Sequence, residues 1–214
     1  MYSNKELIDS LLSSGYADKR VAKAMRRMDR RNFIPKEQKG SAYIDHPLPI
    51  GGGQTISAPG VVAFMSTKLD VRDGMGVLEV GAGSGWQAAI LGELAGKKGE
   101  VWSIERIPEL VKNASENLER SGAKNVTVVH GDGTEGYPKK SPFDRIIVTA
   151  AAPQIPPPLQ EQLAEGGKLL MPVGGSFFQN LIIVEKKAGE TSSDSIMSVI
   201  FVPLIGKYGY GERP

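Results

Sequence analysis

A glycine-rich turn follows an early apolar run, in the stretch "LEVGAGSGWQAA". Glu79 closes that run, and Gly81, Gly83 and Gly85 permit a tight turn whose backbone amides lead into a helix N-terminus. Such a terminus favours a negatively charged group or a carboxylate. A plain strand-to-helix turn explains one glycine more readily than three. A dinucleotide fingerprint has glycine at its sixth position, where this sequence has Trp86, so a pyrophosphate cofactor is less expected.

The next two apolar runs also end beside a carboxylate. The second run ends at Glu105, followed by Arg106, and an acid at this position can accept both hydroxyl groups of a ribose. After the third run, Asp132 lies between Gly131 and Gly133 and could accept a hydrogen bond from an adenine amino group. The alternatives are a solvated strand-end carboxylate for the glutamate and an Asp-Gly turn for the aspartate. Three such strand ends together favour a ligand that contains adenosine.

The uncharged stretch "IGGGQTISAPG", residues 50–60, is too polar for a core strand and has apolar neighbours on both sides. Its three glycines would let the backbone lie against an extended peptide or a cofactor, and Thr55 and Ser57 would add hydroxyl groups. For Ser57 an equally good interpretation is that it is the N-cap of a helix that begins near Pro59. For Gln54 and Thr55 the alternative is ordinary turn chemistry.

Alternating strands and helices must position these groups. Strand-length apolar runs occupy residues 75–80, 100–105, 126–129, 143–149 and 167–173, and helical periodicity occupies 85–96 and 108–121. Such alternation predicts a parallel sheet that is covered on both faces. Two late runs, 180–185 and 196–204, leave no room for a helix between them and predict an antiparallel pair at the sheet edge. We therefore expect an α/β fold with a doubly wound, mostly parallel sheet and an antiparallel C-terminal edge.

The first third of the chain is predicted to be helical. Apolar residues at helical spacing predict a helix over 4–14, and Asp18 caps a second one. The second helix carries a basic stripe from Lys19 to Arg31, and residues 18–39 have a net charge of +6. This stripe is either a solvated outer face or a phosphate-binding surface, and the solvated face is the more ordinary interpretation.

Composition narrows the classes of function. The chain has 214 residues, 40% of them hydrophobic, and a net charge of +2. This small net charge does not indicate binding to nucleic acid or to an anionic membrane. It has no cysteine, so disulfides, thiolate nucleophiles and cysteine-ligated zinc are excluded. His46 and His130 are too far apart to suggest metal spacing, and we expect no metal. No apolar run approaches the roughly 18 residues of a membrane span, so we expect a cytoplasmic protein.

Four stretches, read together, resemble the protein-L-isoaspartate (D-aspartate) O-methyltransferase family. They are "AYIDHPLPIGGGQTISAPGVVAFM", "VLEVGAGSGWQAAILGELAG", "GDGTEGYP" and "AAAPQIPPPLQEQLAEGGKLLMPVG", and the resemblance covers about residues 5–204. The Gly-x-Gly-x-Gly element occurs in many methyltransferases, whereas "PLPIGGGQTIS" resembles this family in particular. Trp86 departs from the tyrosine expected after "GSG" in microbial members, but an aromatic side chain is kept.

The resemblance implies methyl transfer from S-adenosyl-L-methionine to the free α-carboxylate of L-isoaspartyl residues, in a Rossmann-like methyltransferase fold. The ester then cyclises to a succinimide, which hydrolyses partly to normal aspartate. A carboxylate with a pKa of about 4 is already ionised at pH 7, so the reaction requires no general base. Ser57 aligns with the family's active-site serine, and we assign it the orientation of the attacking carboxylate. Whether D-aspartyl residues are accepted stays open.

The remaining site residues divide into two groups on this interpretation. The cofactor-binding residues are Gln54, Thr55, Glu79, Gly81, Gly83, Ser84, Gly85, Glu105, Arg106, Gly131, Asp132 and Gly133. The substrate-binding residues are Ile56, Ala58, Pro59, Val202, Pro203 and Leu204. We expect a single domain over 1–214, with a helical N-terminal extension (1–70) that carries the active-site loop 50–60, and an α/β core (71–214). The expected partners are isoaspartyl proteins and peptides, with no nucleic acid or membrane, and the expected state is a monomer.

Two rival functions fit parts of the sequence. An RNA methyltransferase would explain the basic stripe and use the same cofactor pocket, but an Asn-Pro-Pro-Tyr type motif is missing after the fourth strand, where "TAAAPQ" stands. A non-catalytic adenosine-binding module would keep the glycine-rich turn and have no use for "GGGQTIS".

Overall fold

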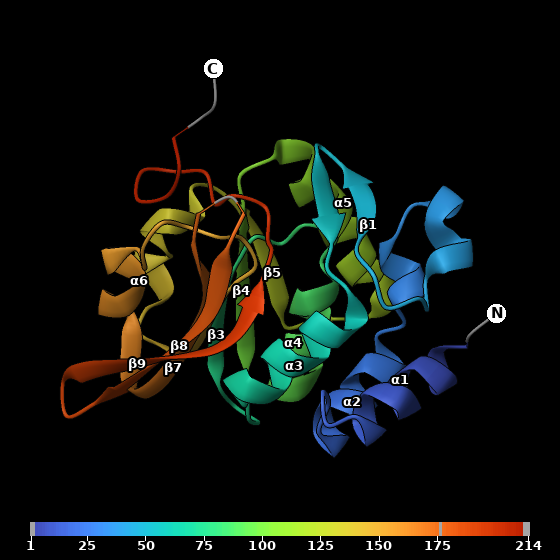
Figure 1. The fold of residues 1–214 in the computed structure, drawn as a ribbon, viewed down its shortest axis with the longest axis horizontal. Helices are drawn as coiled ribbons and strands as arrows, with labels where there is room; N and C mark the ends of the chain where they lie inside the picture. Colours follow the sequence, from blue (N-terminus) through green and yellow to red (C-terminus); the bar gives the residue numbers. More distant parts are fainter. Residues whose placement is uncertain (1–2, 176, 212–214) are drawn as a thin grey trace.

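A seven-stranded sheet forms the centre of the computed structural model, which describes residues 3–175 and 177–211 (Figure 1). The strand order is β5-β4-β3-β6-β7-β8-β9. The strands are β3 (Gly76–Val80), β4 (Glu100–Glu105), β5 (Val126–His130), β6 (Phe143–Val148), β7 (Leu163–Gly174), β8 (Gln179–Lys187) and β9 (Glu190–Val199). The first two residues and the last three of the predicted 1–214 domain lie outside the described part.

Most of the sheet is parallel, and its strand order reverses once. β3 pairs in parallel with β4 and with β6, β4 with β5, and β6 with β7. β8 pairs antiparallel with both β7 and β9. The chain runs outward from β3 to β5 and then returns to β6 on the other side of β3, which creates a crevice at the carboxyl ends of these strands. The predicted doubly wound sheet with an antiparallel edge is confirmed.

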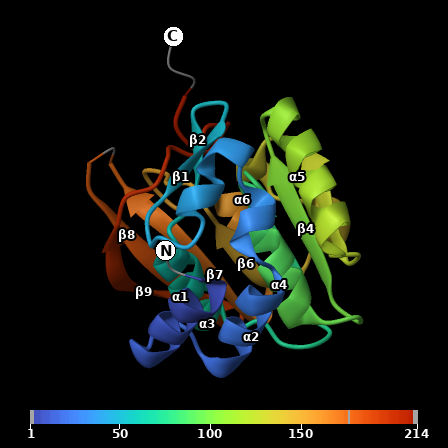
Figure 2. The ribbon, with the colours of Figure 1, turned by 90° about the vertical axis from the view of Figure 1, so that its right-hand side faces the viewer.

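Helices cover both faces of the sheet. The helices are α1 (Asn4–Ser13), α2 (Lys19–Arg27), α3 (Pro59–Leu69), α4 (Trp86–Ala95), α5 (Pro108–Ser121) and α6 (Pro157–Glu161), with short 3-10 helices η1 (Arg30–Phe33), η2 (Lys36–Ser41), η3 (Gly133–Glu135) and η4 (Pro138–Lys140). Side chains alternate across the strands: Val77 joins the core beneath α1 to α5, whereas Leu78 packs on the opposite face with Leu159 of α6. Figure 2 shows α1 and α2 beside α3 and α4, so the N-terminal extension thickens one layer.

The expected active-site loop contains a small antiparallel hairpin instead of helix or irregular chain. Its strands are β1 (Leu48–Gly51) and β2 (Gln54–Ile56), which form a sheet of their own. The turn between them needs its three glycines because Gly51, Gly52 and Gly53 have φ values of 93°, 58° and 69°, in the left-handed region. These glycines therefore make the turn, and a Cβ at Gly52 would meet Ile107 at the start of α5.

Part of the basic stripe of α2 and η1 is paired with carboxylates of the same chain. Arg20 lies 3.3 Å from Asp70, and Arg27 lies 2.7 Å from Glu93 of α4. Arg30 is only 1% exposed. The Arg27–Glu93 pair thus links the N-terminal extension to the core, and such pairing weakens the interpretation as a phosphate-binding surface.

The predicted strand over 196–204 is wrong in its position. β9 spans Glu190–Val199, and its first half, "TSSDS", is exposed and therefore lacks the apolar alternation that marks a strand. After β9 the chain leaves the sheet edge and crosses the carboxyl ends of the central strands. There the Ala151 amide donates to the Val202 carbonyl at 2.8 Å, and the Leu204 amide donates to the Ala151 carbonyl at 2.7 Å. Within the described ranges, no helix has the length and apolarity of a membrane span.

Candidate active site

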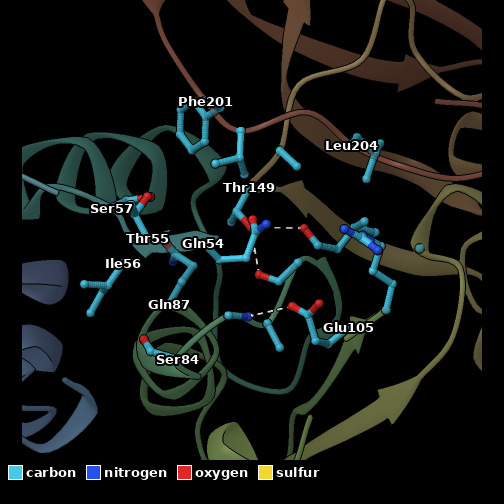
Figure 3. A pocket seen from close by; sticks show the side chains of 18 of the residues that line it. Gln54, Thr55, Ile56, Ser57, Ser84, Gln87, Glu105, Thr149, Phe201 and Leu204 are labelled. Carbon is cyan, nitrogen blue, oxygen red and sulfur yellow. Dashed lines mark hydrogen bonds between the residues drawn. The ribbon is translucent and has the colours of Figure 1, made fainter. Parts of the chain in front are cut away.

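A cavity lies at the carboxyl ends of β3, β4 and β6, at the point where the strand order reverses (Figure 3). It encloses about 880 Å³ of atom-free space, which includes open solvent at its mouth. The strand-end wall comprises Val80–Ser84, Ile104–Ile107, Gly133, Thr149 and Ala150. The outer wall comprises Gln54–Ser57 and Phe201–Ile205. Val62 and Met65 of α3 and Trp86 and Gln87 of α4 complete the lining.

The structure brings most of the predicted site residues together around this cavity. Those that border it are Gln54, Thr55, Ile56, Ser57, Gly81, Gly83, Ser84, Glu105, Arg106, Gly133, Val202, Pro203 and Leu204. Those that lie outside it are Ala58, Pro59, Glu79, Gly85, Gly131 and Asp132. Figure 3 shows Thr55, Ile56 and Ser57 grouped on one side and Glu105 across from them. The individual roles assigned from the sequence stay predictions.

The first three amides of the glycine-rich turn donate hydrogen bonds within the protein. The Gly81 and Ala82 amides both donate to the Ile104 carbonyl, at 2.8 and 3.2 Å, and the Gly83 amide donates to Glu105 at 2.9 Å. A Cβ on Gly81, whose φ is 97°, would come within 2.4 Å of Thr149 Oγ1. Glycine is therefore required at position 81, because the Thr149 side chain occupies the place of a Cβ.

Gly85 and Trp86 serve the packing around the turn. Gly85 has φ 83°, and a Cβ there would lie 3.2 Å from the Ala114 carbonyl of α5. The indole of Trp86 turns away from α5, and its Nε1 donates to the Met28 carbonyl at 2.7 Å. A large side chain is accommodated at this position because it packs against the N-terminal extension.

Glu105 presents a fixed carboxylate at the cavity. Its two oxygens accept hydrogen bonds from the Gly83 amide at 2.9 Å and the Ile107 amide at 3.0 Å. Each oxygen keeps acceptor capacity, because a carboxylate oxygen can accept two hydrogen bonds. A preoriented, buried carboxylate beside a glycine turn fits the paired hydroxyls of a ribose. The donor and acceptor set at this wall is thus compatible with an adenosine group.

Asp132 lies beside the cavity, in an adjoining hollow. One of its oxygens accepts from the Thr134 amide at 2.8 Å, and the other accepts from the Lys207 amide at 2.8 Å. The Asp-Gly turn expected as the alternative is therefore present, and contact with an adenine stays a prediction. Arg106 and Ile205 border both hollows.

Glu79 is fully buried beneath the glycine turn. Its Oε2 accepts a hydrogen bond from Ser103 Oγ, and for Oε1 no partner is found among the described residues. Burial is the main cause that raises the pKa of Glu79 to about 8; the Ser103 hydrogen bond opposes this shift and the charge of Glu105 adds to it. At neutral pH this carboxyl is mostly protonated in the unliganded chain.

Ser57 is not the cap of the following helix, so that alternative is wrong. α3 has Ala58 at its N-cap and Pro59 at its first position. Asp45 supplies the cap instead, because its Oδ1 accepts from the Gly60 amide at 2.7 Å. Ser57 is half-buried in the outer wall, and its hydroxyl is not committed to the helix.

Sequence reasoning missed several residues of the lining. Thr149 directly follows β6, and its hydroxyl donates to the Gly81 carbonyl at 2.7 Å. Inspection of the fourth strand end would have found it. Val62, Met65 and Gln87 carried no such signal, since buried residues on α3 and α4 look like ordinary helix core. In the part of the chain that the structure describes, no group of three or more metal-ligating side chains is found.

Known proteins resemble this chain over almost its whole length. The sequence model of the family described as protein-L-isoaspartate(D-aspartate) O-methyltransferase matches residues 2–209. A protein-L-isoaspartate O-methyltransferase of Methanothrix thermoacetophila is 53% identical over 97% of each chain. One of Methanococcoides burtonii is 50% identical over 95% of this chain and 100% of its own.

A solved structure agrees with the sequence relatives. It is a Plasmodium falciparum protein assigned as a protein-L-isoaspartate O-methyltransferase and crystallised with S-adenosyl-L-homocysteine. It superposes with a TM-score of 0.87 at 29% identity, over 96% of this chain and 99% of the other. With a family match over nearly all of its sequence and relatives at this identity, the chain belongs to the protein-L-isoaspartate (D-aspartate) O-methyltransferase family.

Proposed function

We propose that this chain transfers the methyl group of S-adenosyl-L-methionine to the free α-carboxylate of L-isoaspartyl residues in damaged proteins and peptides. The methyl ester then collapses to a succinimide, and part of it returns to normal aspartate. The single observation that carries the proposal is the cavity, in which an adenosine-compatible strand-end wall faces the "QTIS" segment of the hairpin and residues 201–205. A binding module for adenosine alone would not need the outer wall.

The chemistry asks little of the side chains beyond positioning. The cofactor supplies an electrophilic methyl group, and the substrate carboxylate is already an anion at neutral pH. Attack cancels charge, so exclusion of water and in-line alignment should provide most of the acceleration, on the order of 7–11 kcal/mol. The apolar lining of the cavity, including Ile56, Phe201 and Leu204, supports such exclusion.

Three groups receive roles in this proposal. Ser57 orients the attacking carboxylate from the outer wall. Glu105 holds the ribose hydroxyls, with Gly81 and Gly83 allowing the cofactor to approach the backbone. Val202 and Pro203, together with Ile56, contact the peptide around the damaged residue.

Several finer points remain predictions. These are the acceptance of D-aspartyl residues, a monomeric state and a cytoplasmic location. The RNA alternative is weakened, because three basic side chains of α2 lie in intramolecular pairs such as Arg27–Glu93. We therefore expect no methylation of RNA.

One assay separates these functions. The chain is incubated with methyl-labelled S-adenosyl-L-methionine and, in parallel, an L-isoaspartyl peptide, its aspartyl twin, its D-aspartyl twin and bulk RNA. We expect base-labile label on the L-isoaspartyl peptide and none on the aspartyl twin, and the D-aspartyl arm decides that open point. Base-stable label on RNA, or equal label on the aspartyl twin, would overturn the proposal.

A further inference from the structure

Arg30 is a buried cation whose hydrogen bonds converge on backbone carbonyls. It lies in η1, and the residue as a whole is 1% exposed. Nη1 donates to the carbonyls of Ala42 at 3.1 Å and Ile44 at 3.2 Å. Nη2 donates to the carbonyls of His46 at 2.9 Å and Ser57 at 3.1 Å. One side chain therefore holds four main-chain groups from separate segments of the chain.

These carbonyls flank the hairpin on both sides. Three belong to residues 42–46, which precede β1, and the fourth belongs to Ser57, which follows β2. An isolated hairpin of two short strands is at best marginally stable, so its position relative to the cavity must be set from outside. The fork of Arg30 supplies that restraint, because it joins the two ends of the hairpin at its base.

The same guanidinium also reaches the cofactor side of the cavity. Its Cζ lies 5.5 Å from the ring centroid of Trp86, within the range of a cation–π contact. Trp86 begins α4 directly after the glycine turn and borders the cavity. Arg30 thus lies between the backbone that carries Ser57 and the helix that carries the glycine turn.

A side chain that only filled space in the core would not be a buried arginine without an ion-pair partner. Among the described residues no carboxylate lies within ion-pair distance of Arg30, and its Nε lacks a hydrogen-bond acceptor. Burying a charge without a direct counter-ion is costly, and an apolar side chain of similar size fills a core at lower cost. What the guanidinium adds is a rigid, multi-donor geometry aimed at chosen carbonyls.

We propose that Arg30 is a positioning residue for methyl transfer, which fixes the Ser57 backbone relative to the glycine turn and so aligns the two walls of the cavity. This inference rests on the role proposed above for Ser57. It gives the N-terminal extension a function in turnover, because η1 holds the outer wall that the α/β core cannot hold by itself.

The test compares Arg30→Lys with Arg27→Lys as a matched control. Lysine keeps the charge but has no planar fork that spans four carbonyls. Arg27 is the control because its side chain is 62% exposed and pairs with Glu93 away from the cavity. We expect Arg30→Lys to lower kcat for the isoaspartyl peptide by about 10- to 100-fold, the usual cost of a misplacement near 1 Å, while the Kd for S-adenosyl-L-homocysteine changes by less than about 3-fold. Arg27→Lys should leave both unchanged.

A double-mutant cycle with Ser57→Ala separates positioning from a general loss of stability. If Arg30 acts through Ser57, Arg30→Lys should lower kcat by less than about 2-fold in the Ser57→Ala background. Equal losses in both backgrounds, or a loss no larger than that of Arg27→Lys, would overturn the inference. Arg30→Met, of similar volume and no charge, is the second variant if the lysine variant does not fold, and all assays are run where circular dichroism shows the native fold.

Failure of the proposed function and failure of the Arg30 inference give different results in this experiment. Inactivity of the wild-type chain on the isoaspartyl peptide would defeat the proposed function itself. A Ser57→Ala variant with unchanged kcat would defeat the role of Ser57, and this inference with it. Additive effects in an active enzyme with a slow Ser57→Ala variant would defeat the Arg30 inference alone.

Discussion

The two walls of the cavity are built in different ways. The strand-end wall follows the parallel strands β3, β4 and β6, whose ladders run through the middle of the sheet and whose side chains there are mostly buried. The outer wall comes from a two-stranded hairpin and from residues 201–205, and several of its residues, such as Thr55 and Pro203, are exposed. The rigid strand-end wall suits a small ligand of constant shape. The outer wall, which is made of two segments distant in sequence, suits a protein chain whose side chains vary.

The largest predicted effect is on ligand binding, and it compares Gly81 of the strand-end wall with Gly53 of the hairpin turn. Gly81→Ala should weaken binding of S-adenosyl-L-homocysteine by about 100-fold, or about 2.8 kcal/mol, because its Cβ would lie 2.4 Å from Thr149 Oγ1. Gly53→Ala is the control, since Gly53 also has a positive φ, of 69°, but open space around it. It should cost about 1 kcal/mol of unfolding free energy and leave ligand binding intact. Isothermal titration calorimetry measures the binding, and equal loss in both variants would contradict the distinction between the walls.

Ser57→Ala tests the outer wall. Removing one oriented donor should lower kcat by roughly 10- to 100-fold while the Kd for S-adenosyl-L-homocysteine stays nearly constant. The reason is that Ser57 borders the cavity on the side away from Glu105 (Figure 3). Steady-state kinetics with the isoaspartyl peptide gives kcat, and calorimetry gives Kd. Parallel loss of turnover and ligand affinity would remove the assigned role.

The carboxyl of Glu79, buried beneath the strand-end wall, predicts a pH dependence of the free energy of unfolding. Burial raises its pKa from 4.5 to about 8, so the folded chain holds a proton that the unfolded chain releases. This contribution to stability is fully present below pH 4.5 and is lost as the pH rises toward 8, with a slope of at most about 1.4 kcal/mol per pH unit. Glu79→Gln should flatten the slope in urea unfolding of the unliganded chain. An unchanged slope would show that another group is responsible.

The smallest effect concerns the link between the N-terminal extension and α4. Arg27→Ala should lower the free energy of unfolding by less than about 1 kcal/mol, because the Arg27–Glu93 pair is mostly solvent-exposed on its arginine side. The difference should shrink further in high salt. Urea unfolding at two ionic strengths measures it, and turnover should match the wild type. A large loss would mean that surface pairing, and not the shared apolar core, holds the extension in place.

The same contrast explains which elements the sequence predicts well. The predicted bounds of β3, β4, β5 and β6 agree with the structure to within two residues, because buried parallel strands are continuous apolar runs. Glu105 and the glycine turn follow these strands, so the amino-acid pattern alone predicts that they meet at one edge of the sheet. A strand at the sheet edge has no such signature, and the polar first half of β9 is missed for that reason.

The outer wall depends on contacts between distant segments, which no local pattern reports. β2 has only three residues, too few for alternation to be seen. In the sequence Arg30 looks like the other cations of the basic stripe. Only the structure shows that α2 ends at Arg27 and that Arg30, beyond this end, is buried. The capping of α3 by Asp45 is likewise hidden, since the two lie in different elements.

Residues 201–205 leave the ribosome about 150 residues after Gln54, although both segments bound the same cavity. During synthesis the residues of the strand-end wall are therefore all present long before the second segment of the outer wall. A nascent polypeptide that ends within β9 already has its central strands but cannot enclose a reaction. The chain can therefore enclose a reaction only after residues 201–205 have been synthesised.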